Sequence, residues 1–303
     1  MSQDDASQQR AAPAAFTVDV CGLQLAARAW GPADGMPVLA LHGWMDNAAS
    51  FDALAPLLSK LRLVALDITG HGWSEHRPAG AVYHFVDAVS DVALAAEALG
   101  WSSYALLGHS MGAGIATLLA GCFPERITHL MLIEGLGPMS TPARDAPNRL
   151  RRAVMQRTAL QQRSSAVYPS RRAMVDRLRE ALPDLTENAA TTLVERGSRP
   201  VAGGVTWRAD PRLRGISPHR LTEPTVQAYL RAVDAPALLI RGRASTILEV
   251  AEVAERREAI AHLEDVTLEG GHHLHLTHPQ PVATAIEGFL GRHQATLAAE
   301  PQK

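Results

Sequence analysis

The chain has 303 residues, of which 47% are hydrophobic, and its 29 basic and 31 acidic side chains leave a formal net charge of −2. This balance excludes a general attraction to nucleic acid or to an anionic membrane. No stretch approaches the ~18 consecutive apolar residues that a membrane-spanning helix requires. The composition predicts a soluble globular protein with small-molecule partners, no nucleic-acid partner and no membrane partner, and it leaves the oligomeric state open.

The two cysteines and the two ends of the chain bear on the compartment. Cys21 and Cys122 have neither metal-ligand nor redox spacing. We expect both to be buried small apolar residues, which fits a cytoplasmic location. Residues 1–15 are rich in Gln, Ala, Ser and Asp and lack the basic region and apolar core of a signal peptide. We therefore expect a disordered tail at 1–15 and a flexible tail at 296–303.

From residue 16 onward, short apolar runs typical of strands alternate with amphipathic or Ala-rich runs typical of helices. The predicted strands are 16–20, 23–29, 38–41, 63–66, 104–107, 127–133, 237–240 and 264–268, and the predicted helices are 48–58, 86–99, 113–122, 249–261 and 281–292. This alternation predicts an α/β fold, a mostly parallel sheet covered by helices on both faces.

An insertion interrupts this alternation between residues 137 and 224. The segment is punctuated by proline, reads as helical without a convincing apolar strand, and contains sixteen arginines against eight acidic residues. The expected core is therefore 16–136 together with 225–295, and 137–224 forms a separate helical unit. Its positive charge fits either a solvated helical surface or a basic lid that steers anionic or carboxylated substrates towards a cleft.

The sequence Gly-His-Ser-Met-Gly at 108–112 lies between a predicted strand and a small-residue helix. A serine on such a sharp strand-to-helix turn exposes its hydroxyl, and the crowded backbone requires glycine two residues before and two after it. The pattern alone also fits a serine in an ordinary turn. Its context indicates instead that Ser110 is a nucleophile.

A serine hydroxyl is barely ionised at neutral pH, so it requires a base within hydrogen-bonding reach. His272 follows the last predicted strand and a Gly-Gly pair that allows the loop to reach back over the sheet, and we choose it as the base. The neighbouring His273, His275 and His278 also raise the alternative of a metal site. Because only Glu269 stands nearby as a further ligand, we expect no metal, with His275 and His278 as packing or surface groups.

The base requires an acid to orient it, and the acid is the member of the set that the sequence defines least well. The commonest place, directly after the strand at 237–240, holds no carboxylate. One strand earlier, Glu134 follows 127–133 at the sheet edge where active sites of open α/β sheets gather. We choose Glu134, with Glu249 as the alternative. Glu134 could instead form a salt bridge to an arginine of the insertion.

Acyl transfer also requires two donors for the negative oxygen of the tetrahedral intermediate. The backbone N–H of Met111, directly after the nucleophile, and that of Trp44, after the strand at 38–41, are placed to supply them. We expect the Met111 side chain to line the acyl pocket as well. The glycine-spaced loop at 67–74 lacks a P-loop lysine and the dinucleotide glycine order, so we interpret it as structural and expect no cofactor.

With these motifs in place, the chain resembles the α/β-hydrolase superfamily over about residues 16–295. The segments LHGWMDNAASFDALAPLL and GHSMGAG are similar to the serine hydrolase-like α/β-hydrolases. The resemblance implies an eight-stranded sheet, a helical cap between strands six and seven, a Ser-His-acid triad and no cofactor. Haloalkane dehalogenases and epoxide hydrolases have a similar layout, but they use an aspartate where Ser110 stands, and a hydroxyl suits attack on an acyl carbon.

The motifs predict a serine hydrolase that cleaves a small-molecule carboxylic ester through an acyl-enzyme intermediate. Relatives on this fold also cleave lactones, thioesters or C–C bonds or act as perhydrolases, and the motifs do not separate these reactions. An alternative of another class is a ligand-binding pseudo-hydrolase in which the pocket senses a small molecule.

Overall fold

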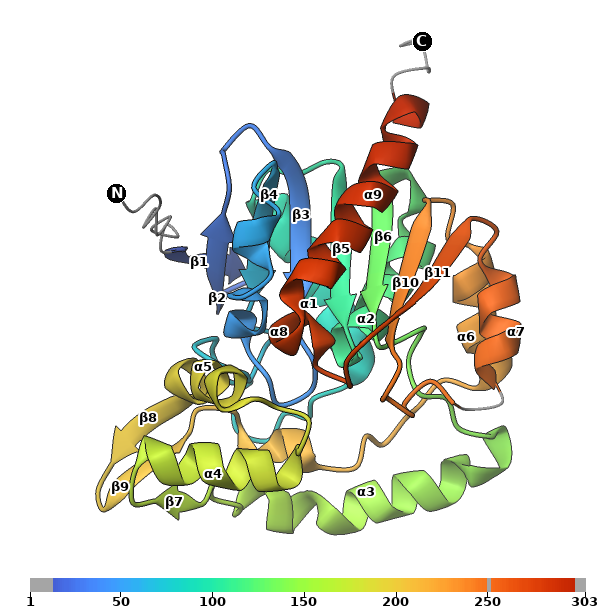
Figure 1. Ribbon diagram of the computed structural model, residues 1–303. Coiled ribbons are helices and arrows are strands. Elements are labelled where there is room, and N and C mark those ends of the chain that lie inside the picture. Colours follow the sequence, from blue (N-terminus) through green and yellow to red (C-terminus); the bar gives the residue numbers. More distant parts are fainter. Residues whose placement is uncertain (1–12, 250–251, 298–303) are drawn as a thin grey trace, which may run out of the picture.

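The computed structural model describes residues 13–249 and 252–297 (Figure 1). Its main sheet has eight strands in the order β1-β2-β4-β3-β5-β6-β10-β11. The strands are β1 (Ala14–Val20), β2 (Leu23–Trp30), β3 (Met36–Leu41), β4 (Leu61–Leu66), β5 (Tyr104–His109), β6 (Ile127–Ile133), β10 (Ala237–Gly242) and β11 (Leu263–Leu268). Strands β4, β3, β5, β6, β10 and β11 pair in parallel, whereas β2 is antiparallel to both β1 and β4. The prediction of a mostly parallel eight-stranded sheet is confirmed.

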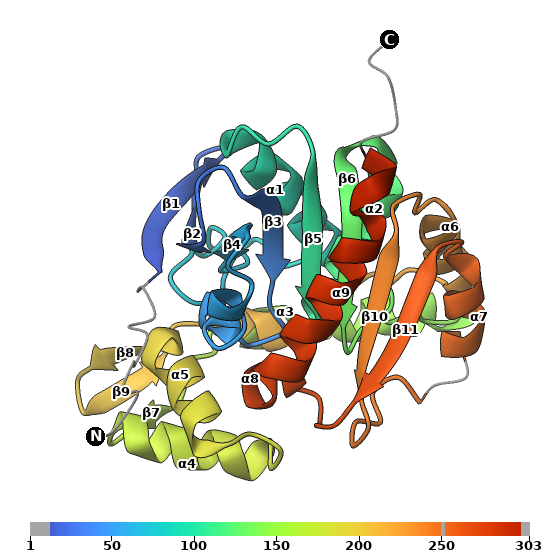
Figure 2. The same ribbon diagram turned by 45° about the horizontal axis from the view of Figure 1, so that its top comes forward.

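Two helical layers cover the sheet, because its central strands are apolar on both faces. The side chains of β5 alternate, with Leu106 in one core and Ala105 and Leu107 in the other. The first core packs against α1 (Phe85–Ala98), α2 (Met111–Cys122), α6 (Glu223–Arg231) and α7 (Glu252–Ala259). The second packs against the 3₁₀ turns η1 (Ala48–Phe51) and η2 (Ala55–Leu57) and against α8 (Leu274–Thr277) and α9 (Pro279–Leu297), as both ribbon views show (Figures 1 and 2).

Some local predictions were wrong. The helix expected at 48–58 is two 3₁₀ turns. The Asn47 side chain accepts the N–H of Ala49 at the start of η1, and Pro56, which has no N–H to donate, interrupts the helical hydrogen bonds at η2. Helix α6 was not predicted. Of the helix expected at 249–261, α7 begins at Glu252, and residues 250–251 lie outside the described part.

The ends of the chain and the cysteines also differ from expectation. Residues 1–12 and 298–303 lie outside the described residues, but Ala14 and Ala15 already belong to β1 and α9 extends to Leu297. Both cysteines are free and exposed rather than buried, since Cys21 lies in the β1–β2 turn and Cys122 at the end of α2. In the described part of the chain, no helix is both long enough and apolar enough to cross a membrane.

A smaller layer, which we call the cap, lies between β6 and β10 in sequence and beyond the carboxyl ends of the parallel strands (Figure 1). Its helical elements are η4 (Ala143–Asp145), α3 (Ala146–Gln161), α4 (Arg171–Ala181), α5 (Glu187–Gly197) and η5 (Pro211–Arg214). It also contains a three-stranded antiparallel sheet of β7 (Val167–Tyr168), β8 (Ser198–Val201) and β9 (Gly204–Trp207). The purely helical interpretation was therefore wrong, because strands of two to four residues are too short to show an alternating pattern.

Buried ion pairs fasten the cap to the core. The guanidinium of Arg196 on α5 donates to both oxygens of Asp67, at 3.1 and 2.8 Å, and Asp67 is fully buried after β4. The same carboxylate accepts the N–H groups of Ala48 and Trp73, both at 2.7 Å. The glycine-spaced loop at 67–74 is thus structural, as predicted, and its Asp67 binds Arg196 of the cap.

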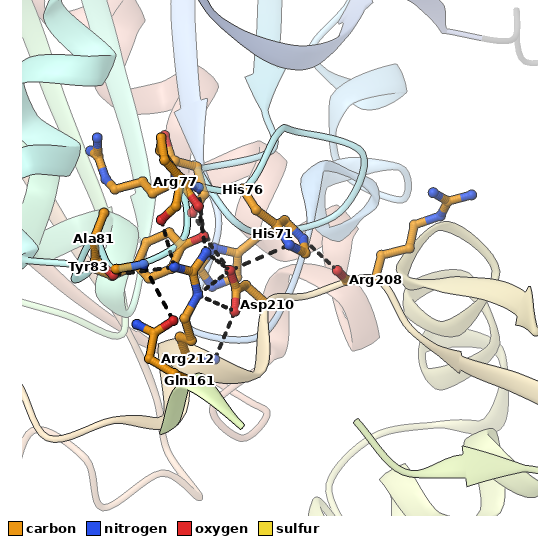
Figure 3. A network of polar contacts seen from close by, with 12 residues as sticks. His71, His76, Arg77, Ala81, Tyr83, Gln161, Arg208, Asp210 and Arg212 are labelled. Carbon is orange, nitrogen blue, oxygen red and sulfur yellow. Dashed lines mark hydrogen bonds and ion pairs between the residues drawn. The ribbon is translucent and has the colours of Figure 1, made fainter. Parts of the chain in front are cut away.

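A second anchor surrounds Asp210, next to η5 (Figure 3). Its carboxylate accepts hydrogen bonds from Arg212 of the cap and, at 2.7 Å, from Tyr83 of the core. The Asp210 backbone N–H also donates to the carbonyl of Gly70. Arg212 belongs to the cap and Tyr83 to the core, so the network around Asp210 holds η5 in a fixed place above the sheet.

The close approach of β5, α2 and β3 permits no side chain at Gly112. A Cβ atom there would lie 2.0 Å from the carbonyl oxygen of Leu41. We predict that Gly112→Ala lowers the free energy of unfolding by at least about 2 kcal/mol, because backbone rather than a flexible side chain must move. The matched control is Gly291→Ala on α9, where a Cβ meets nothing within 4 Å; it should raise stability by about 0.5–1 kcal/mol. Urea unfolding measures both, and equal stability of the two variants would contradict the packing argument.

Candidate active site

Ser110 occupies the turn between β5 and α2 in a left-handed conformation, with φ 53° and ψ −112°. This conformation is unfavourable for a residue with a side chain, and it persists because the surroundings fix it. The Ser110 N–H donates to the carbonyl of Ile133 on the neighbouring strand at 2.9 Å. Gly108 and Gly112 allow the close approach, since a Cβ on Gly108 would lie 2.6 Å from the Ala113 backbone. The predicted strand, turn and helix are all present.

His272 lies between Ser110 and Glu134. Its Nε2 is 3.0 Å from Ser110 Oγ, and its Nδ1 is 3.3 Å from Glu134 Oε2. A carboxylate only accepts, so Nδ1 carries the proton and donates to Glu134. The unprotonated Nε2 then faces the hydroxyl of Ser110. The structure thus brings together the three side chains chosen from the sequence, in the order in which a base is oriented on one side and a nucleophile activated on the other.

Glu134 is held at the end of β6 by contacts to β10. Its backbone has φ 53°, its N–H donates to the carbonyl of Ile240, and its side chain is almost fully buried. One carboxylate oxygen accepts the N–H of Gly242 at 2.6 Å, and the other accepts the hydroxyl of Ser245 as well as His272. Among the described residues its only ion-pair partner is His272, so the alternative of a salt bridge to an arginine of the insertion is wrong.

Two residues that follow β10, Ser245 and Glu249, bear on the choice of the acid. Ser245 lies just after β10, in the place where a carboxylate is commonest, and it hydrogen-bonds to the carboxylate that β6 supplies. The sequence reasoning missed Ser245, although a hydroxyl in an otherwise empty acid position was a usable signal. Glu249 is exposed, and the hydrogen bond from His272 goes to Glu134 instead.

The two backbone amides proposed for the oxyanion belong to Met111, at the start of α2, and to Trp44, in the loop after β3. Met111 is the first residue of α2, where N–H groups have no acceptor within the helix. Trp44 follows β3 in a loop that His42 fixes: His42 Nδ1–H donates to the Gly43 carbonyl at 2.7 Å, and Nε2 accepts from Ile68 N–H at 3.0 Å. The Trp44 side chain is exposed, and its indole N–H donates to the carbonyl of Leu213 on η5. The cap therefore reaches the edge of the site.

Three further imidazoles lie behind His272. His109 is fully buried, and its Nε2–H donates at 2.9 Å to the carbonyl of His272, so it holds the base loop. His273 Nε2 is 3.5 Å from Asp46. His275 is fully buried with its Nε2 2.7 Å from the hydroxyl of Ser50, whereas His278 is exposed. His275 and His278 are thus a packing and a surface group, as predicted.

Burial favours the neutral form of two of these imidazoles, His109 and His275. Burial, reinforced by the charges that neighbouring imidazoles would carry, lowers the pKa of His275 to about 3 and that of His109 well below its ordinary value. Burial acts to raise the pKa of Asp46, but the hydrogen bond and charge of His273 outweigh it and the pKa is lowered. In residues 13–249 and 252–297, no three His, Cys, Asp or Glu side chains are arranged to hold a metal ion.

Comparison with known proteins identifies the family of the chain. The family model of the alpha/beta hydrolase fold matches residues 36–279, so the chain belongs to the α/β-hydrolase family. A serine hydrolase-like protein of Dictyostelium discoideum is 32% identical over 284 residues, covering 89% of this chain and 79% of that protein. The crystal structure of a hypothetical protein from Pseudomonas aeruginosa PAO1 has a TM-score of 0.88 to this chain, with 41% sequence identity, and covers 91% of this chain and 99% of that one. A thioesterase domain from the curacin biosynthetic pathway is 26% identical with a TM-score of 0.83, over 92% and 100%. The resemblance to serine hydrolase-like α/β-hydrolases is confirmed.

The depressed pKa of His275 predicts a loss of stability in acid. The unfolded chain takes up this proton near pH 6.5, but the folded chain does so only near pH 3. Between these values the unfolded state binds more protons, so stability falls as the pH falls, by up to about 1.4 kcal/mol per pH unit. We expect His275→Gln, which retains a polar group facing Ser50, to lose about 2 kcal/mol less than wild type between pH 7 and 5 in urea unfolding. His278→Gln is the exposed control, and a His275→Gln profile equal to that of wild type would refute the prediction.

Proposed function

We propose that this protein is a serine hydrolase that cleaves a small-molecule carboxylic ester through an acyl-enzyme intermediate. The observation that carries the proposal is the position of His272, 3.0 Å from the hydroxyl of Ser110 and 3.3 Å from the carboxylate of Glu134. Nucleophile, base and acid are then Ser110, His272 and Glu134. The chain belongs to the α/β-hydrolase family, which performs hydrolysis with side chains at this edge of the sheet, and this supports the assignment.

In the acylation step, Ser110 Oγ attacks the carbonyl carbon of the ester while its proton moves to His272 Nε2. Glu134 stabilises the resulting imidazolium through Nδ1–H. The negative oxygen of the tetrahedral intermediate accepts the N–H groups of Trp44 and Met111. When the intermediate collapses, the bond to the alcohol oxygen breaks, and that oxygen takes the proton from His272.

In the deacylation step, a water molecule replaces the alcohol. His272 removes a proton from the water as its oxygen attacks the acyl carbon, and the second tetrahedral intermediate uses the same two amides. Collapse returns the proton to Ser110 Oγ and releases the carboxylic acid. The sequence of steps requires no cofactor, because each proton moves between the substrate, water and His272.

A thioester is a second candidate substrate. One specific observation favours it, namely that a solved neighbour 26% identical to this chain is a thioesterase domain. The proposed steps apply unchanged, with a thiol in place of the alcohol. Comparing an oxygen ester with a thioester of the same acyl group would establish which leaving group the site prefers.

The nucleophile assignment predicts a burst. With p-nitrophenyl butyrate, stopped-flow measurement of wild type should show a rapid release of p-nitrophenol followed by slower turnover, because acylation precedes hydrolysis of the acyl-enzyme. Ser110→Ala should lose at least about 10³-fold in kcat while its circular dichroism and unfolding curve stay those of wild type. Comparable turnover by the folded variant would defeat the assignment, and a wild type inactive towards both ester and thioester would favour a ligand-binding role.

The acid assignment predicts a difference between two glutamates. Glu134→Gln keeps the shape of the side chain but removes the charge that stabilises the His272 imidazolium, so kcat should fall by about 10² to 10⁴-fold. Glu249→Gln changes an exposed side chain and should leave kcat within about twofold. Steady-state kinetics with the same ester compare the two variants. If Glu249→Gln were the impaired one, the acid would be wrongly assigned.

A further inference from the structure

The cap carries a pocket of about 460 Å³, which we call the cap pocket. It shares no residue with Ser110, His272, Glu134 or the two proposed oxyanion amides. Its lining comes from the segment after α3, from β7, β8 and β9 with the loops next to them, from the first residue of η5, and from one residue of the core. The lining residues are His76, Arg163, Ser164, Ser165, Val167, Arg199, Val201, Ala202, Thr206, Trp207, Arg208, Ala209 and Pro211.

The cap pocket is positively charged. Arg163, Arg199 and Arg208 line it and no acidic residue does. Within the described residues, none of these three guanidinium groups forms an ion pair. Asp210 adjoins the lining in sequence, but its carboxylate is bonded to Arg212 and Tyr83 and lies 3.4 Å from Nδ1 of His76 (Figure 3). No carboxylate of the described residues therefore pairs directly with the three arginines.

Three other acidic groups of the cap and one of the core are paired with arginines outside the pocket. Asp176 and Glu187 bind Arg172, and Glu180 binds Arg177. Asp67, the buried carboxylate of the core that faces the cap, is occupied by Arg196. Three of the sixteen arginines of the insertion thus line the cap pocket.

Arg208 is the most fixed of the three arginines. Its guanidinium carbon lies 3.6 Å from the centroid of the Trp73 ring, and its Nε–H donates to the carbonyl of Ser198 at 2.9 Å. The side chain extends away from the Asp210 network (Figure 3). Burial, together with the charges of Arg199 and Arg196, lowers its pKa. The protein holds a half-buried cation next to other cations, an arrangement that a bound anion would stabilise.

The remaining lining indicates the kind of anion. Ser164 and Ser165 add hydroxyl donors, and guanidinium groups bind phosphate oxygens in a two-pronged geometry. Val167, Trp207 and Pro211 supply an apolar wall. We propose that the cap pocket binds the phosphate group of a small phosphorylated compound whose apolar part lies against this wall. The proposal does not depend on the chemistry assigned to Ser110.

The test is isothermal titration calorimetry, which measures the affinity of the whole protein for phenyl phosphate and for inorganic phosphate. Arg163 and Arg199 are exposed and free of ion pairs among the described residues, so Arg163→Gln/Arg199→Gln should fold normally, which unfolding curves check. The matched control is Arg151→Gln/Arg152→Gln, which removes the same charge from exposed positions on α3 outside the pocket.

Wild type should bind phenyl phosphate more tightly than inorganic phosphate, and both should weaken as the salt concentration rises. The pocket variant should bind at least about tenfold more weakly, whereas the control stays within about twofold of wild type. Failure of wild type to bind either compound would overturn the proposal, as would equal losses in the two variants, which would indicate a general effect of charge. Equal affinity for the two compounds would overturn the claim that the apolar wall contacts the ligand.

Discussion

A single buried carboxylate determines the arrangement of the site. Glu134 is almost fully buried, and a carboxylate in such a place must be hydrogen-bonded to remain charged. Its partners are the N–H of Gly242, the hydroxyl of Ser245 and the Nδ1–H of His272. The first two belong to the end of β10, and the third to the loop after β11. The carboxylate therefore orients the imidazole of His272 by joining three segments that are distant in sequence.

The left-handed backbone at Glu134 has a counterpart at Ser110, with φ 53° at both residues. Each lies at the carboxyl end of a parallel strand, and both sit where the chain turns sharply after the strand. Ser110 N–H donates to the carbonyl of Ile133, directly before Glu134, so the two turns are also bonded to each other. The cap begins just after the second turn and returns to the core through Arg196 and Asp67. Ser110, Glu134 and the attachment of the cap are thus parts of one connected edge of the sheet.

Sequence reasoning predicted the sheet, the serine turn and the three central side chains because each left a local pattern. An apolar strand followed by Gly-x-Ser-x-Gly, or directly by Glu134, can be read without the fold. The contribution of Ser245 and the hydrogen bond from His109 to His272 could not be predicted, because both depend on the register between distant segments. The cap strands and the exposure of Cys122 were missed for a similar reason: short strands and the ends of helices are determined by tertiary contacts.

The central claim is that His272 makes Ser110 nucleophilic. Its most direct test is labelling with a fluorophosphonate, followed by peptide mass spectrometry to locate the adduct. The account predicts one adduct, on Ser110 Oγ, formed with loss of fluoride, and a rate of labelling that falls by orders of magnitude in a folded His272→Gln variant. An unlabelled wild type, an adduct on another residue, or a rate unaffected by His272→Gln would contradict it.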